Sequence, residues 1–136
     1  MRPSKEQYYL DIALAVSKRS TCLRRQYGAV IVKDDVIIST GYNGSPRGAI
    51  NCCDKGICTR QELNIPAGER YECCEALHAE YNAITAAKYS DMIDGTIYLA
   101  GYDLEKKERI QDPKPCMMCD RAIRNCKLKF VGKADN

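Results

Sequence analysis

The chain has 136 residues, of which 45% are hydrophobic and 29% are charged, and its formal net charge is +3. This length suits one compact domain over residues 1–136 and is too short for two domains of ordinary size. No run of about 18 apolar residues occurs and the first residues lack the apolar stretch of a signal peptide, so a cytoplasmic protein is expected. The weak net charge favours a small anionic ligand over a long nucleic acid.

The predicted elements begin with a helix and a hairpin. Ser4 opens a capping box and apolar residues then recur at helical spacing, which predicts a helix over 4–19. Two β-branched runs, 28–32 and 36–40, are separated by three polar residues and predict a β-hairpin. The next segment, 41–75, shows no periodicity and holds five glycines and five cysteines. A loop of this length is rare in a compact domain unless it is functional or held by something else.

The second half of the chain alternates helices and strands. A helix is predicted over 76–89, with Leu77, Tyr81 and Ile84 on one side. The remaining predicted elements are a strand over 96–100, a polar stretch over 103–114, a helix that Pro115 opens and that runs to 125, and a short strand over 127–131. This order favours a mixed sheet flanked by helices, a three-layer α/β/α domain.

A candidate metal site follows from the single histidine and two of the nine cysteines. His78 and the pair Cys116 and Cys119 each lie where a loop turns into a predicted helix. Cysteines three residues apart share one helix face, at the separation of about 5–6 Å from which one ion can be bridged. Three protein ligands leave the fourth position of zinc to water, which is typical of a catalytic site. Glu80, two residues from His78, is expected to carry protons between that water and the substrate.

The same residues allow two other interpretations. Cys116 and Cys119 could form a redox or structural pair, and a closed structural zinc could use Cys126 as its fourth ligand. The combination of His-x-Glu with Pro-Cys-x-x-Cys is nevertheless typical of zinc-dependent nucleobase deaminases, in which water attacks C4 of cytosine or C6 of adenine.

The sequence resembles the deoxycytidylate (dCMP) deaminases of the cytidine deaminase-like superfamily over nearly the whole chain. The segments 20–30 and 40–48 are similar to the motifs of this subfamily, and 78–84 and 115–119 to those of the wider superfamily. The resemblance implies hydrolysis of dCMP to dUMP and ammonia for thymidylate supply, in a homohexamer that dCTP activates and dTTP inhibits.

The resemblance also suggests residues for nucleotide binding. The expected substrate contacts are Asn43, Arg24 and Ala79. The expected turn for a regulatory nucleotide contains Gly44, Pro46, Arg47 and Gly48. From the residues alone, the glycines allow backbone close to a ligand and the arginines could pair with phosphate, although both also suit an ordinary exposed turn.

A second, structural zinc would explain the other cysteines. Some dCMP deaminases carry one, and Cys22 and Cys52 lie where two of its cysteine ligands would be. The remaining two ligands are expected to be Cys58 and Cys74, with Cys53 and Cys73 as alternatives. Four thiolates would make a closed site that stabilises the long loop.

Two rival functions remain open for this sequence. One is another enzyme of the superfamily, such as a tRNA adenosine deaminase, which the weak net charge disfavours. The other is a non-catalytic, zinc-stabilised binding module, which has no use for Glu80. The sequence stops at Asn136, where relatives usually continue into another strand or helix, so a short form of the domain is expected.

Overall fold

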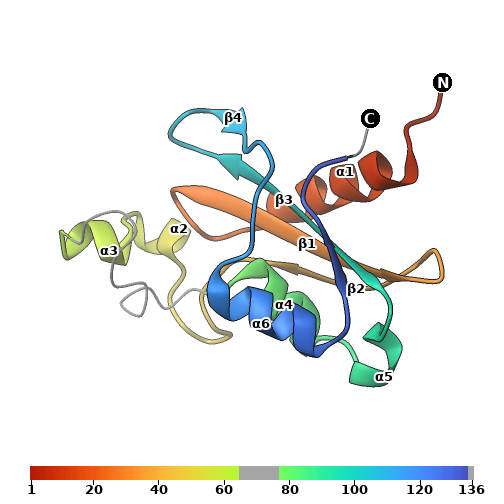
Figure 1. Ribbon diagram of the computed structural model, residues 1–136. Helices are drawn as coiled ribbons and strands as arrows, with labels where there is room; N and C mark the ends of the chain where they lie inside the picture. Colours follow the sequence, from red (N-terminus) through yellow and green to blue (C-terminus); the bar gives the residue numbers. More distant parts are fainter. Residues whose placement is uncertain (65–76, 135–136) are drawn as a thin grey trace.

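A computed structural model of the chain describes residues 1–64 and 77–134 (Figure 1). Within these residues, five strands form one sheet in the order β2-β1-β3-β4, and β5 pairs with β3 on the same edge as β4 but at the opposite end of β3. The strands are β1 (Arg25–Lys33), β2 (Val36–Tyr42), β3 (Thr96–Asp103), β4 (Glu108–Arg109) and β5 (Lys129–Val131). Among the described strands, only β5 runs parallel to its neighbour, so the sheet is mixed, as the sequence predicts.

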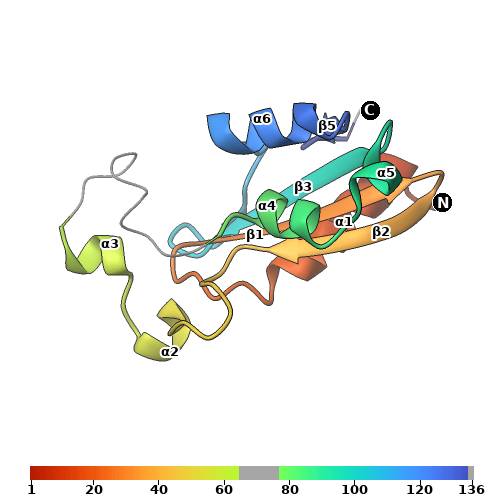
Figure 2. The same cartoon turned by 90° about the horizontal axis from the view of Figure 1, so that it is seen from below.

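Helices cover both faces of the sheet. They are α1 (Lys5–Ser17), α2 (Cys52–Lys55), α3 (Thr59–Glu62), α4 (Ala79–Thr85), α5 (Tyr89–Met92) and α6 (Met117–Asn125). The first helix packs on one face, whereas α4, α5 and α6 pack on the other, and α2 and α3 lie beyond one end of the sheet (Figures 1 and 2). This arrangement confirms the predicted three-layer α/β/α architecture.

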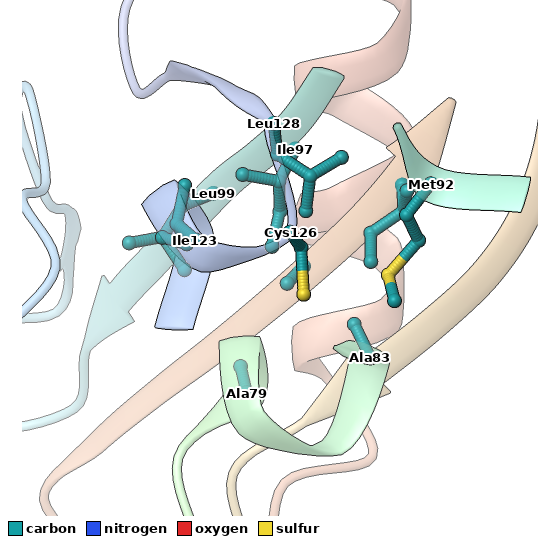
Figure 3. Packing of buried hydrophobic residues seen from close by; sticks show 10 residues of the cluster. Ala79, Ala83, Met92, Ile97, Leu99, Ile123, Cys126 and Leu128 are labelled. Carbon is teal, nitrogen blue, oxygen red and sulfur yellow. The ribbon is translucent and has the colours of Figure 1, made fainter. Parts of the chain in front are cut away.

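Side-chain alternation along β1 supplies both hydrophobic cores. Ala29 and Ile31 belong to the core under α4 and α6, whereas Val30 and Val32 belong to the core under α1. All four are buried, as expected for a central strand covered on both faces. Figure 3 shows the first of these cores, in which Ala79 and Ala83 of α4, Ile123 of α6 and Cys126, the C-cap of α6, meet the sheet. This shared core holds α4 and α6 side by side.

Two glycines let the helices approach the sheet closely. A Cβ atom on Gly28 would lie 2.6 Å from the backbone nitrogen of Ser17 in α1, and one on Gly41 would lie 2.5 Å from the carbonyl oxygen of Ala79 in α4. Real Cβ atoms essentially never come this close to backbone atoms. The two positions therefore fix how tightly α1 and α4 sit on opposite faces.

Several predicted boundaries are wrong. The helix predicted over 76–89 is shorter, because α4 spans only Ala79–Thr85. It starts late because Leu77 pairs with Gly44 through both of its backbone groups, and the chain is extended again at Lys88, before α5. Its buried side is also different: Ala79, Glu80 and Ala83 are buried, whereas Tyr81 is exposed. The two alanines suit the close approach of α4 to Gly41.

Three further expectations need correction. Pro115 precedes the N-cap of α6 and does not lie in its first turn. The polar stretch over 103–114 contains β4, which pairs with the end of β3. The long loop over 41–75 contains α2 and α3. No helix within residues 1–64 and 77–134 is long and apolar enough to cross a lipid bilayer.

Candidate metal centre and active site

The three predicted metal ligands lie at the N-termini of two neighbouring helices. His78 is the N-cap of α4, Cys116 is the N-cap of α6, and Cys119 lies one turn further along α6. The Nδ1 atom of His78 lies 3.5 Å from Cys116 Sγ and 3.3 Å from Cys119 Sγ. The three ligand atoms all lie within 4.8 Å of one another.

This spacing fits zinc. With Zn–S near 2.3 Å and Zn–N near 2.0–2.1 Å, tetrahedral angles require an N···S separation of about 3.6 Å. The observed distances of 3.3 and 3.5 Å are close to that value. Within the described residues, this is also the only group of three or more His, Cys, Asp or Glu ligands that gathers so closely. The closed site with Cys126 is not seen, because that thiol is buried in the core between α6 and the sheet.

The local backbone supports the two sulfur ligands. Cys116 Sγ accepts the backbone N–H of Cys119 at 3.4 Å, in the manner of an N-cap side chain. Such a hydrogen bond and the positive end of the helix both stabilise a thiolate. Burial, together with the Glu80 carboxylate, raises the pKa of the Cys119 thiol well above its usual value. A metal must therefore displace the proton from Cys119 when it binds.

Glu80 lies beside the three ligands and inside the protein. Only 5% of the residue is exposed, and its carboxyl group contacts the side chain of Cys119. Burial raises the pKa of Glu80, while its own backbone N–H and the nearby His78 oppose the shift. A carboxyl group whose pKa is moved toward neutrality can both accept and donate a proton, which suits general acid–base catalysis.

Contacts with β2 and the residues that follow it hold α4 and the residue before His78 in place. Leu77, immediately before His78, forms an isolated antiparallel bridge with Gly44, with N···O distances of 2.7 and 3.1 Å. The side-chain amide of Asn82 donates to the carbonyl of Tyr42 at 2.8 Å. These contacts join the metal ligand to the end of the strand.

Sequence reasoning missed Asn82 and one further contact to α4. Ser39 Oγ donates to the carbonyl of Ala83 at 2.8 Å. A polar residue inside the apolar pattern of β2 is the only sequence signal for this contact.

Asn43, a predicted substrate contact, links two strands in the structure. Its Oδ1 atom accepts the backbone N–H of Tyr27 at 2.8 Å, and its Nδ2 atom donates to the carbonyl of Arg25 at 2.9 Å. One amide hydrogen remains for a ligand after these two bonds. The structure thus gives Asn43 an architectural task that its sequence position did not reveal.

The other two predicted substrate residues occupy different settings. Ala79 is completely buried, so its backbone N–H, in the uncapped first turn of α4, is the group it could offer to a ligand. Arg24 pairs with Glu105 in the β3–β4 connection, with Nε 3.3 Å from Oε1. The guanidinium of Arg24 is therefore directed to that connection.

The predicted regulatory turn is largely exposed. Pro46, Arg47 and Gly48 are all exposed, and the Pro46 carbonyl accepts the N–H of Ala49 at 3.0 Å. Gly48 has a φ of +87°, a left-handed conformation that favours glycine. Gly44 is buried and belongs to the bridge with Leu77.

The remaining cysteines are only partly described. Cys74 and Cys73 lie outside the described residues. Cys22 and Cys52 are half-buried and Cys58 is buried, and these three sulfur atoms do not come together as the ligand atoms of His78, Cys116 and Cys119 do. The backbone N–H of Cys53 donates to the Thr21 carbonyl at 3.0 Å, which places the start of α2 beside the segment of Cys22.

A helix-flanked mixed sheet with a three-ligand metal site and an adjacent buried carboxyl group defines a class of zinc-dependent hydrolases with an open coordination position. Residues 3–132 match the family described as "Cytidine and deoxycytidylate deaminase zinc-binding region". The chain belongs to this family.

Similar proteins agree with that membership. The deoxycytidylate deaminase of Schizosaccharomyces pombe is 35% identical over 96% of this chain and 37% of its own length. The deoxycytidylate deaminase of Mycobacterium phage D29 is 35% identical over 90% of this chain and 88% of its own length. The chain thus spans only part of the first relative and most of the second.

Solved structures share the fold. The dCMP deaminase of cyanophage S-TIM5, determined in complex with dCMP and dUMP, superposes with a TM-score of 0.65 at 22% identity, covering 96% of this chain and 82% of that one. The cytidine deaminase of Mycobacterium tuberculosis superposes with a TM-score of 0.52 at 16% identity, over 96% and 86% of the two chains.

Proposed function

We propose that this protein is a zinc-dependent deaminase that hydrolyses dCMP to dUMP and ammonia. The observation that carries the proposal is the cluster of His78, Cys116 and Cys119 with the buried carboxyl group of Glu80 beside it. The substrate follows from the names of the relatives that match at 35% identity over nearly the whole chain.

The metal ligands, Glu80 and the start of α4 have separate roles in the proposed hydrolysis. Zinc, when bound by the three ligands, lowers the pKa of a water in the fourth position to about 7. Glu80 accepts a proton from the attacking water and delivers protons to N3 of the cytosine and to the departing amine. The C4–N bond breaks, a C4–O bond forms, and ammonia leaves. The backbone N–H of Ala79 is suited to hold the carbonyl group of the base, because the side chain of the N-cap residue His78 does not bond to this end of α4.

The test compares substrates and one variant. Zinc-loaded protein is mixed with dCMP, dCTP, deoxycytidine or an adenosine-containing tRNA stem-loop, and ammonia release is followed. Activity on the tRNA alone would refute the nucleotide assignment. Glu80→Gln should keep fold and zinc but lose turnover by about 10²–10⁴-fold. Near-normal turnover of this variant would refute the proton-transfer role.

The proposal extends to a second zinc bound by Cys22, Cys52, Cys58 and Cys74. Two observations support it among the described residues. The Cys53-to-Thr21 hydrogen bond brings the segments of Cys22 and Cys52 together. Cys22 Sγ also accepts the backbone N–H of Arg24 at 3.4 Å, as Cys116 Sγ accepts an amide at the first site. Amide hydrogen bonds of this kind stabilise a thiolate ligand.

Zinc content separates the two sites. Two zinc ions per chain are expected, with Cys58→Ser losing one and Cys116→Ser losing the other. Cys53→Ser is the matched control, because it changes an exposed neighbouring thiol and should leave both ions in place. A single ion in the unmodified protein would refute the second site.

Regulation and assembly complete the proposal. The exposed turn at Pro46, Arg47 and Gly48 is suited to bind a regulatory nucleotide, and the family resemblance points to dCTP and dTTP as effectors and to a hexamer. Ultracentrifugation with and without dCTP tests the assembly. Arg47→Gln should reduce the dCTP response at saturating dCMP, and an unchanged response would remove Arg47 from the effector site.

A further inference from the structure

The two cysteines of the metal site have a second chemistry besides metal binding. Cys116 is the N-cap of α6 and Cys119 is the third residue of that helix. Cysteines at this spacing and at a helix N-terminus are typical of dithiols that exchange with disulfides. We propose that, when zinc is absent, Cys116 and Cys119 form a reversible disulfide by exchange with a small-molecule disulfide, and that this bond and bound zinc exclude each other. The inference concerns the metal ligands alone and does not depend on the substrate.

The fold brings the two sulfur atoms together without help from a metal. Cys116 Sγ accepts the backbone N–H of Cys119 at 3.4 Å, so it already lies over the residue to which it would bond. Both sulfur atoms also contact the same Nδ1 atom of His78, at 3.5 and 3.3 Å. All three ligand atoms lie within 4.8 Å of one another. A disulfide therefore requires a short movement within a single helical turn.

Zinc and a disulfide require different separations of the same two atoms. A tetrahedral zinc with Zn–S bonds near 2.3 Å holds two sulfur ligands about 3.8 Å apart. A disulfide joins them at about 2.05 Å. Zinc also binds the thiolate form of cysteine, which a disulfide no longer offers. Of the three ligands, only His78 would remain in the oxidised protein, so the two states cannot coexist.

The exposure of the two cysteines gives them different roles. Cys116 is exposed, whereas Cys119 is buried, with 6% of the residue accessible. The residues between them, Met117 and Met118, are 74% and 78% exposed, so the turn that joins the two cysteines is open to solvent. A small disulfide can reach Cys116 but not Cys119. Cys116 is therefore the attacking thiol and Cys119 the resolving one.

The exchange with oxidised glutathione proceeds in two steps. The thiolate of Cys116 attacks one sulfur of the reagent, the S–S bond of the reagent breaks, and one glutathione leaves. Cys119 then attacks the mixed disulfide at Cys116 Sγ, and the second glutathione leaves. The two protein thiols give up two electrons and two protons, which end on two glutathione thiols. A dithiol reductant reverses both steps and restores the ligands for zinc.

Peptide mass spectrometry tests whether the disulfide forms. Protein freed of zinc by a chelator is incubated with oxidised glutathione below its melting temperature, and the remaining thiols are alkylated. The tryptic peptide over 110–121 contains Cys116 and Cys119 and no other cysteine. It should lack both alkyl groups and be lighter by two hydrogens, whereas zinc-loaded protein in excess zinc should give the doubly alkylated peptide.

Cys53→Ser is the matched control for this experiment. Cys53 is the other exposed cysteine among those that the structure describes, and it lies outside the peptide over 110–121. Its replacement should leave the result for that peptide unchanged. A doubly alkylated peptide from the metal-free protein would overturn the proposal, as would equal disulfide formation in excess zinc.

Trapping of the intermediate tests the order of attack. Metal-free Cys119→Ser should retain one glutathione on Cys116, whereas Cys116→Ser should leave Cys119 almost unmodified. A short incubation of the unmodified protein, with fragmentation of the same peptide, gives the same information without a substitution: the first glutathione should lie on Cys116. Equal amounts on the two cysteines, as expected for an unfolded chain, would overturn the assigned roles.

Zinc uptake tests the mutual exclusion. The measurement uses Cys58→Ser, so that the proposed second zinc site does not contribute. The reduced protein should take up one zinc, and the oxidised protein should take up none until a dithiol reductant is added. Full uptake by the oxidised protein would overturn the proposal. None of these readouts involves turnover, so a failure of the proposed dCMP deamination would leave them unaffected.

Discussion

Replacing Gly41 with alanine should loosen the metal site without touching a ligand. The new Cβ atom would lie 2.5 Å from the Ala79 carbonyl oxygen and 2.9 Å from the Asn82 carbonyl carbon. Both atoms belong to the backbone of α4, so no side chain can rotate away. Ordinary contact begins near 3.4 Å, and the helix would have to move by about 1 Å. Overpacking of this kind costs about 1–3 kcal/mol of folding free energy.

The consequence for zinc follows from the position of His78 at the start of the same helix. Metal–ligand distances are kept within about 0.2 Å of their ideal values, and a shift of about 1 Å against Cys116 and Cys119 exceeds that several-fold. We therefore expect Gly41→Ala to weaken zinc binding as well as to destabilise the fold. The assay is competition for zinc with a chromophoric chelator under conditions in which the variant remains folded, beside urea unfolding of the same sample.

Gly28→Ala is the matched control for this experiment. Its Cβ atom would clash with the backbone of α1 on the opposite face, 2.6 Å from the nitrogen of Ser17. It should lower the free energy of unfolding while the folded protein keeps its zinc affinity. Equal zinc affinities for the two variants would show that α4 is not positioned by its approach to Gly41, and the reasoning would fail.

Three further outcomes are expected. Ser4→Ala should lower the free energy of unfolding by about 1 kcal/mol in urea titrations, because Ser4 Oγ accepts the Gln7 N–H at 3.2 Å as the N-cap of α1; an unchanged value would show that packing alone holds this end. The hydrogen bond of 2.5 Å from Tyr9 to Asp35, together with burial, raises the pKa of Tyr9 to about 12. The protonated hydroxyl of Tyr9 therefore stabilises the fold fully below the unfolded-state pKa of about 10, and this stabilisation is lost as the pH rises through 12. The stability advantage over Tyr9→Phe should accordingly shrink between pH 10 and 12, and a constant difference would contradict this linkage. Removal of zinc by a chelator should lower the melting temperature reversibly, since a ligand present at about a thousandfold above its Kd adds about 4 kcal/mol to the free energy of unfolding. An unchanged melting temperature would mean that the fold does not depend on metal.

The metal site could be predicted from sequence because its information is local. Cys116 and Cys119 lie on one helix turn, and Glu80 follows His78 by two residues, so short spacings determine most of the geometry. The three-layer architecture could be predicted for the same reason, because the alternation of helices and strands is also read from short segments. The pairing of the His-x-Glu motif with the Pro-Cys-x-x-Cys motif required only the knowledge that these two motifs occur together.

The supports of the site could not be predicted, because they depend on distant pairings. Gly41 reads in the sequence as a turn glycine, but its role comes from the backbone of α4 packed against it. Likewise, Asn82 reads as an exposed helix residue until its amide is seen on the Tyr42 carbonyl. The short strand β4 lacks any apolar pattern of its own and exists because the end of β3 offers it a partner.

The boundary of one strand changes how two neighbouring arginines are placed. A strand that begins at residue 28 leaves Arg24 and Arg25 in a loop, where both are equally plausible phosphate ligands. The observed strand begins at Arg25, so the alternation that directs Ala29 toward α4 and α6 also applies to Arg25. Asn43 holds this end of β1 through the carbonyl of Arg25, and the segment that follows it pairs with the residue before His78. The same short segment thus ties the start of β1 to the metal ligand, and substitutions at Asn43 should therefore affect the start of β1 and zinc binding together.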